Sequence, residues 1–182
     1  MTQTIHLKTN SPTETQQIGD KLGQVLSEMI RAENMTQQII ALQGNLGAGK
    51  TTFTQGLASG LGVVAHVTSP TFTLVNEYET SIGYPLIHVD SYRLGDLSAE
   101  SGEEDESIAL DAATFGLEEI LDDGQAIVVI EWADRVVSLL DDDYLRVELG
   151  YRGESLDGRT LVMMGIGRQS RGIVSRMKAD IG

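Results

Sequence analysis

The sequence predicts an α/β fold of three layers, in which a mainly parallel sheet with antiparallel edge strands is covered by helices. Short apolar runs of strand length alternate with segments of helical periodicity, which is typical of βαβ crossovers. The chain of 182 residues has 41% hydrophobic and 22% charged residues, a globular composition. Because it contains no internal repeat or low-complexity linker, we expect one domain spanning residues 1–182.

The first expected elements are a short strand and a long amphipathic helix. Residues 4–7 alternate in polarity, as in a strand. The run Ser11-Pro12-Thr13-Glu14 then combines an N-cap serine, a proline at the first helical position and a glutamate three residues after the cap. Apolar residues at helical spacing predict a helix that ends near Asn34.

The remaining elements follow the same logic of apolar runs and periodicity. A strand over residues 39–42 precedes a glycine-rich loop at residues 44–49 and a helix from Lys50 to about Leu61. Residues 72–78, 86–90 and 127–131 are expected to be strands, and the last two runs end in an acid. Residues 144–149 and 159–164 alternate in polarity, which predicts antiparallel edge strands, and a C-terminal helix is expected over residues 170–179.

The glycine-rich loop carries the strongest functional signal. Residues 44–51 fit the phosphate-binding pattern G-x-x-x-x-G-K-[ST] between a predicted strand and a predicted helix, which indicates a P-loop NTPase fold. Glycines let backbone N–H groups turn toward phosphates, Lys50 supplies a charge for the β- and γ-phosphates, and the Thr51 hydroxyl is a ligand for Mg²⁺. The expected nucleotide-binding residues are Gly44, Asn45, Leu46, Gly47, Ala48, Gly49, Lys50, Thr51 and Thr52.

Two acids stand at the ends of predicted strands, where ligands bind in open α/β sheets. Asp90 and Glu131 are the candidate catalytic carboxylates. One would hold Mg²⁺ through water and the other would polarise the attacking water, and the residues alone leave open which does which. The hydroxyl-rich residues 68–73 are candidates for a loop that senses the γ-phosphate. His88 alternates with Asp90, so both are expected to point the same way, with a hydrogen-bonding role for His88.

Composition and charge exclude several other functions. The chain has no cysteine, which excludes a disulfide scaffold, a thiolate nucleophile and cysteine-ligated metal sites. The net charge of −14 argues against autonomous binding of nucleic acid. No apolar stretch approaches the roughly 20 residues of a membrane span, and the N-terminus is unlike a signal peptide, so we expect a cytoplasmic protein with no membrane contact. Many of the acids fall in an insertion at about residues 98–113, expected to be solvated, whereas residues 168–178 form a small basic tail.

Four blocks, taken in order, resemble the TsaE (YjeE) family of bacterial P-loop ATPases: residues 44–52, 68–78, 88–94 and 130–135. The resemblance implies ATP and Mg²⁺ as cofactors and weak hydrolysis by the isolated protein. It also implies a role in forming threonylcarbamoyladenosine (t6A) on ANN-decoding tRNAs with the partners TsaB and TsaD, the tRNA being reached through that complex.

The same resemblance implies site roles. Lys50 and Thr51 would hold phosphate and metal, Glu131 would be a metal ligand in a Walker B-like block with Trp132, and Asp90 would be a functional acid. The acidic insertion departs from the family pattern, and we expect it to affect docking to partners rather than nucleotide chemistry.

Two other functions remain open on the sequence. In a P-loop small-molecule kinase, Asp90 would accept a substrate proton and Arg93 or Arg135 would clamp phosphate, but an acidic insertion is a poor lid over phosphates. In a nucleotide-gated binding module, ATP would act as a conformational ligand and its hydrolysis would be incidental. A GTPase is disfavoured because the chain has no N-K-x-D segment to read guanine.

Overall fold

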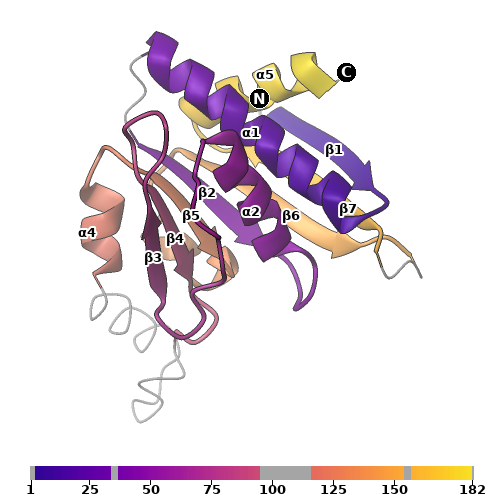
Figure 1. Cartoon of the computed structure of the whole chain (residues 1–182), viewed down its shortest axis with the longest axis horizontal. Helices are drawn as coiled ribbons and strands as arrows, with labels where there is room; N and C mark the ends of the chain where they lie inside the picture. Colours follow the sequence, from indigo (N-terminus) through magenta and orange to yellow (C-terminus); the bar gives the residue numbers. More distant parts are fainter. Residues whose placement is uncertain (1–2, 34–36, 95–115, 154–156, 182) are drawn as a thin grey trace.

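A seven-stranded sheet in the order β1-β7-β6-β2-β5-β4-β3 forms the centre of the molecule (Figure 1). The computed structural model describes residues 3–33, 37–94, 116–153 and 157–181. The strands are β1 (Gln3–Thr9), β2 (Gln38–Gln43), β3 (Val75–Tyr78), β4 (Leu86–Asp90), β5 (Ile127–Glu131), β6 (Tyr144–Tyr151) and β7 (Arg159–Gly165). The helices are α1 (Pro12–Glu33), α2 (Lys50–Gly60), α4 (Leu117–Asp122) and α5 (Arg168–Ile181), with 3₁₀ turns η1 (Ala133–Arg135) and η2 (Val137–Leu139).

The sheet is mixed, with a parallel centre, and this confirms the predicted α/β class. Strands β6, β2, β5 and β4 run parallel to one another, whereas β7, β1 and β3 pair antiparallel with their neighbours. The prediction that β6 and β7 are edge strands is wrong, because β7 lies between β6 and β1 and the edges are β1 and β3. Their alternating polarity reflects one face that is open to solvent and not an unpaired edge.

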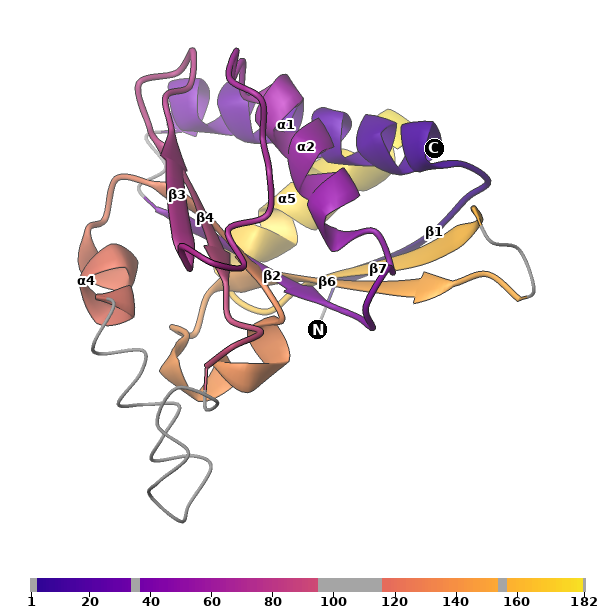
Figure 2. The same cartoon turned by 60° about the horizontal axis from the view of Figure 1, so that its bottom comes forward.

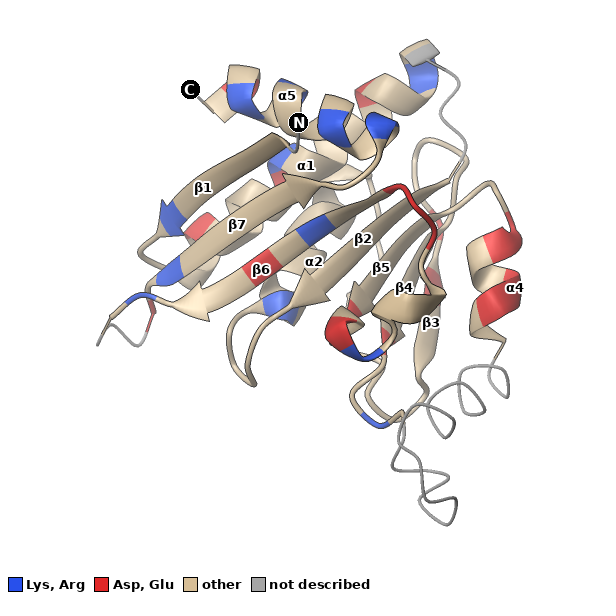
Figure 3. Ribbon diagram, turned by 180° about the vertical axis from the view of Figure 1, so that it is seen from behind, with Lys and Arg blue, Asp and Glu red and all other residues tan. Residues whose placement is uncertain are grey.

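Helices cover the two faces of the sheet unequally. Helices α1, α2 and α5 pack on one face, where Leu22, Phe53 and Ile173 are fully buried (Figure 2). On the other face, α4 and the 3₁₀ turns pack against β2, β4 and β5. No helix of the described residues covers β1, β7 and β6 on that face (Figure 3), and the partly exposed Arg146 and Glu148 lie on that side of β6. The third layer is therefore partial.

Several boundaries differ from the expected ones for local reasons. The start of α1 has the predicted cap, since the Ser11 hydroxyl accepts a 3.2 Å hydrogen bond from the Glu14 N–H. Strand β3 begins at Val75 and not at residue 72, because the chain turns first: the Leu74 N–H donates to the Pro70 carbonyl and Leu74 has a φ of 65°. Helix α4 has no counterpart among the expected elements. The acidic insertion at residues 98–113 lies outside the described residues.

No helix in the described part of the chain is both long and apolar enough to cross a membrane.

Glycines bring α1 into close contact with α2. A Cβ atom on Gly56 of α2 would lie 2.0 Å from the carbonyl oxygen of Gln16, and one on Gly60 would lie 2.0 Å from that of Asp20. On the facing side, a Cβ atom on Gly19 would lie 2.2 Å from the carbonyl oxygen of Phe53. The two backbones therefore approach each other with no room for a side chain, which fixes the position of α2 relative to α1.

We expect Gly56→Ala to lower the free energy of unfolding by about 1–3 kcal/mol, because overpacking against a backbone carbonyl forces α1 and α2 apart. Urea unfolding measures this change. Gly172→Ala in α5 is the matched control: its Cβ would meet only the Met29 methyl at 3.6 Å, so helix propensity should raise stability by about 0.5–1 kcal/mol. Equal stability of Gly56→Ala and the wild type would contradict this packing.

Candidate functional site

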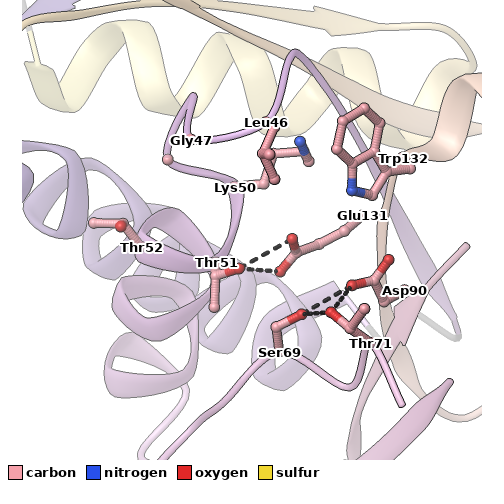
Figure 4. Close-up of a pocket in the computed structure, with 11 residues that line it drawn as sticks. Leu46, Gly47, Lys50, Thr51, Thr52, Ser69, Thr71, Asp90, Glu131 and Trp132 are labelled. Atoms are coloured by element: carbon pink, nitrogen blue, oxygen red, sulfur yellow. Dashed lines mark hydrogen bonds between the residues drawn. The ribbon is translucent and has the colours of Figure 1, made fainter. Parts of the chain in front are cut away.

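The register of the parallel strands β2, β5 and β4 brings the candidate site residues together at the carboxyl ends of these strands. Both Leu42 of β2 and Asp90 of β4 pair with Glu131 of β5. The glycine-rich loop begins directly after β2, so it lies beside both acids. They share a cavity of about 330 Å³ (Figure 4). Of the expected nucleotide-binding residues, those lining the cavity are Leu46, Gly47, Gly49, Lys50, Thr51 and Thr52, whereas Gly44, Asn45 and Ala48 belong to the same loop outside the lining.

The loop has a backbone conformation that favours glycine and exposes N–H groups. Gly44, Gly47 and Gly49 have φ angles of 141°, 75° and 101°, which residues with side chains rarely adopt. The N–H of Phe53 donates to the carbonyl of Gly49 at 2.9 Å, so the earlier N–H groups of α2 have no acceptor within the helix. A helix N-terminus after a glycine-rich turn is an anion-binding arrangement.

Lys50 lies buried at the cavity, with 5% of its surface exposed. Its Nζ donates to the carbonyls of Gly44 at 2.6 Å and Asn45 at 3.2 Å, and lies 3.6 Å from the centre of the Trp132 ring. Burial lowers the pKa of Lys50, and the nearby carboxylates of Glu131 and Asp90 offset part of this shift. The ammonium group is therefore only partly compensated, and it would be stabilised by an anion in the cavity.

Glu131 is buried and held by two side chains from different elements. The Thr51 hydroxyl donates to its carboxylate, with oxygen–oxygen distances of 2.8 and 3.0 Å. The fully buried His88 places its Nε2 2.8 Å from Oε1 of Glu131. A carboxylate only accepts hydrogen bonds, and Nδ1 of His88 has no hydrogen-bond partner among the described residues. We therefore assign the proton to Nε2, which donates to the carboxylate. His88 thus makes the expected hydrogen bond, and Glu131 is fixed against the start of α2.

Asp90 has a different set of partners. Its Oδ2 accepts hydrogen bonds from the hydroxyls of Ser69 at 2.8 Å and Thr71 at 2.7 Å, and its Oδ1 accepts one from the Tyr92 N–H at 3.0 Å. The hydroxyl-rich segment expected near the phosphates is therefore tied to Asp90. The two carboxylates stand side by side (Figure 4), one fixed to the start of α2 and the other to the segment that precedes β3.

The donor set of the cavity fits Mg²⁺. Adjacent ligands of an octahedral Mg²⁺ with bonds of about 2.1 Å are separated by about 3.0 Å, and the Thr51 hydroxyl and the Glu131 carboxylate are already 2.8 to 3.0 Å apart. In the described part of the chain, no group of three or more His, Cys, Asp or Glu side chains is placed to hold a metal. Such an ion would therefore take its remaining ligands from phosphate and water, as Mg²⁺ commonly does.

Trp132, expected in the Walker B-like block, and Arg135, a candidate phosphate clamp in the kinase alternative, have distinct positions. Trp132 lines the cavity and adopts a φ of 60°, which turns the chain directly after Glu131. Arg135 donates to the carbonyl of Leu94 at 2.6 Å and lies over the Tyr92 ring, outside the cavity lining.

Two residues that the sequence does not mark also contact the loop. The Tyr151 hydroxyl donates to the carbonyl of Leu46 at 2.9 Å. Arg159 donates to the carbonyls of Gly47 and Ala48, both at 3.0 Å. They lie more than 100 positions from the loop, at the end of β6 and the start of β7, and no local motif contains them. Only the pairing of β6 with β2 and β7 could have indicated them.

Known proteins provide an independent comparison. The chain matches the family described as "Threonylcarbamoyl adenosine biosynthesis protein TsaE" over residues 9–161. It is 38% identical over 152 residues to the tRNA threonylcarbamoyladenosine biosynthesis protein TsaE of Streptomyces coelicolor, covering 82% of this chain and 91% of that one. It is 35% identical over 131 residues to the protein of the same name from Bacillus subtilis, covering 72% of each. The crystal structure of Bacillus subtilis YdiB superposes with a TM-score of 0.70 at 26% identity, over 100% of this chain and 99% of that chain. This chain therefore belongs to the TsaE family.

Proposed function

We propose that this chain is the Mg²⁺-dependent, ATP-binding and ATP-hydrolysing component of the machinery that forms t6A on tRNA. The observation that carries the nucleotide chemistry is the single cavity shared by the glycine-rich loop, Lys50 and the bonded pair Thr51 and Glu131. Family membership supports the pathway, since relatives at 35% and 38% identity carry the name of t6A biosynthesis.

In this proposal the triphosphate lies along the loop and the first turn of α2. The free N–H groups of that turn bind phosphate oxygens, and Lys50 exchanges its carbonyl acceptors for the β- and γ-phosphates. Asp90 and Glu131 are buried next to this position. Two carboxylates would repel a triphosphate, so a divalent cation between them and the phosphates is needed for tight ATP binding.

The different partners of the two acids favour a division of roles. We assign Glu131, already bonded to Thr51, to the metal together with that hydroxyl. Asp90, held by Ser69 and Thr71, is assigned to orient the attacking water. Mg²⁺, when bound, would neutralise charge that develops on the phosphates. His88 and Ser69 would keep the two carboxylates in place while water is attacking.

Exposed apolar side chains flank the cavity and favour a protein partner there. Leu46, at the tip of the loop, is 77% exposed, and Phe72, next to Thr71, is 88% exposed. A partner covering these side chains would bury apolar surface and exclude water from the phosphates. We propose TsaB and TsaD as the partners on this face, with tRNA reached through their complex.

Lys50→Ala should weaken binding of Mg²⁺–ATP and Mg²⁺–ADP by about tenfold to a hundredfold, because a charge-assisted hydrogen bond to phosphate is worth about 1.5–3 kcal/mol. Isothermal titration calorimetry of the full chain measures this. Lys8→Ala, at an exposed position of β1, is the matched control and should bind as the wild type does. Unchanged affinity in Lys50→Ala would refute the proposed phosphate site.

Glu131→Gln should lower the rate of ATP hydrolysis by at least about a hundredfold, the usual scale for losing a positioned electrostatic group, while ADP affinity falls much less. The rate is measured by phosphate release in the presence of TsaB and TsaD. Asp134→Asn is the control, since Asp134 is an exposed acid near Lys50 that does not line the cavity. A wild-type rate for Glu131→Gln would refute the metal role of Glu131.

Association with TsaB and TsaD should require nucleotide and the apolar residues beside the cavity. A pull-down with and without ATP measures the first requirement, and the double variant Leu46→Ser/Phe72→Ser should lower retention at least about tenfold through lost apolar burial. Val64→Ser, at a position 99% exposed beyond the far end of α2, is the control and should be retained normally. Binding that is independent of ATP would contradict the nucleotide requirement, and no association with or without ATP would favour the small-molecule kinase instead.

A further inference from the structure

All five carbonyl groups from Gly44 to Ala48 accept hydrogen bonds from side chains. Lys50 supplies those to Gly44 and Asn45. The other three come from β6, which pairs with β2, and from β7, which pairs with β6: Tyr151 Oη donates to Leu46, Arg159 Nη2 donates to Gly47, and Arg159 Nε donates to Ala48. The Arg159 guanidinium also lies 4.5 Å from the centre of the Tyr151 ring, so the two donors support each other.

These contacts determine where the loop N–H groups point. The described residues contain no cis peptide bond, and in a planar trans peptide the carbonyl and the following N–H point in opposite directions. Binding the carbonyls of Leu46, Gly47 and Ala48 therefore turns the N–H groups of Gly47, Ala48 and Gly49 away from Tyr151 and Arg159. The Ala48 N–H is satisfied within the loop by the Asn45 carbonyl at 3.1 Å. Gly47 and Gly49 line the cavity.

We propose that Tyr151 and Arg159 act as a brace that holds the phosphate-binding loop in its anion-binding conformation before the nucleotide arrives. Both are positioning residues, and the inference rests on the proposed nucleotide function. Without the brace the loop would have to be ordered at the moment of binding, and that ordering would weaken affinity. The planar guanidinium of Arg159 donates to Ala48 and Gly47 from two separate nitrogens, Nε and Nη2, held at a fixed spacing. A lysine at position 159 would offer one ammonium nitrogen in place of these two.

The loop sequence is adapted to this brace. A Cβ atom on Gly47 would lie 2.5 Å from the Tyr151 hydroxyl oxygen, so glycine at this position lets the tyrosine approach the backbone. Arg152, the next residue after Tyr151, instead donates to the Asn10 side chain. The chain thus offers a nearby arginine of equal charge that does not contact the loop, which separates bracing from a general electrostatic effect.

The test measures affinities for Mg²⁺–ADP and for inorganic pyrophosphate by calorimetry on the full chain. We expect Arg159→Lys and Arg159→Met to bind both ligands about tenfold more weakly and Tyr151→Phe about threefold more weakly, on the scale of one or two lost hydrogen bonds. Arg152→Met should bind as the wild type does. Amide hydrogen exchange of Gly47 and Gly49 without nucleotide should be faster in Arg159→Lys than in the wild type, a readout that general destabilisation elsewhere would not confine to this loop.

The outcomes are distinct. Wild-type affinity for both ligands in Arg159→Lys would mean that only the positive charge at position 159 matters, and it would overturn the brace. A loss of affinity in Arg152→Met as large as that in Arg159→Met would overturn it as well. If the Arg159 variants do not fold, wild-type affinity in Tyr151→Phe overturns the proposal and a threefold loss supports it. Failure of the wild type to bind either ligand would instead refute the proposed function, and the brace with it.

Discussion

The register between β2, β4 and β5 is the constraint on which the rest of the site depends. Because Leu42 and Asp90 both pair with Glu131, the loop after β2 begins at the level where two carboxylates leave their strands. Ser91 extends this alignment beyond the strands, since its N–H and hydroxyl both donate to the Glu131 carbonyl. A slip of one residue in β5 would turn Glu131 to the opposite face of the sheet, away from Thr51 and His88. Apolar packing on both faces of these strands opposes such a slip, so the hydrophobic core determines the geometry of the charged site.

The charged side chains at this site are buried, and each has hydrogen-bond partners within the protein. Lys50 bonds to carbonyls of its own loop and lies against Trp132, while Glu131 accepts from Thr51 and His88. Leaving such groups unpaired would cost several kcal/mol each. Under the proposed function, phosphate and Mg²⁺ would replace the Lys50 and Thr51 bonds, so binding would exchange one set of partners for another. The bonds from His88 to Glu131 and from Ser69 and Thr71 to Asp90 would remain, and they would keep the carboxylates oriented during this exchange.

Local sequence patterns were sufficient where one segment determines the structure. The glycine-rich pattern predicts the loop before α2, and apolar runs ending in an acid predict β4 and β5 with Asp90 and Glu131 at their ends. Contacts between distant segments could not be predicted in this way. The alternating polarity of β6 and β7 indicates that one face of these strands is exposed to solvent, but it does not indicate which strands lie beside them. Their internal positions in the sheet were therefore not predicted. Arg159 and Tyr151 reach the loop only through that pairing. The turn before β3 depends on a positive φ at Leu74. Leucine rarely adopts this conformation, so the residue type does not predict the turn.

Under the proposed function, one cavity built by this register binds the phosphates and the metal of Mg²⁺–ATP together. A crystal structure of the chain with a non-hydrolysable ATP analogue and Mg²⁺ would test this. We expect the β-phosphate to lie against the N–H groups of Gly47 and Gly49, and Lys50 to move from its carbonyls to phosphate. Mg²⁺ should be bound by the Thr51 hydroxyl, with Glu131 in its immediate surroundings. A nucleotide bound elsewhere on the molecule, or a metal that contacts neither Thr51 nor Glu131, would contradict it.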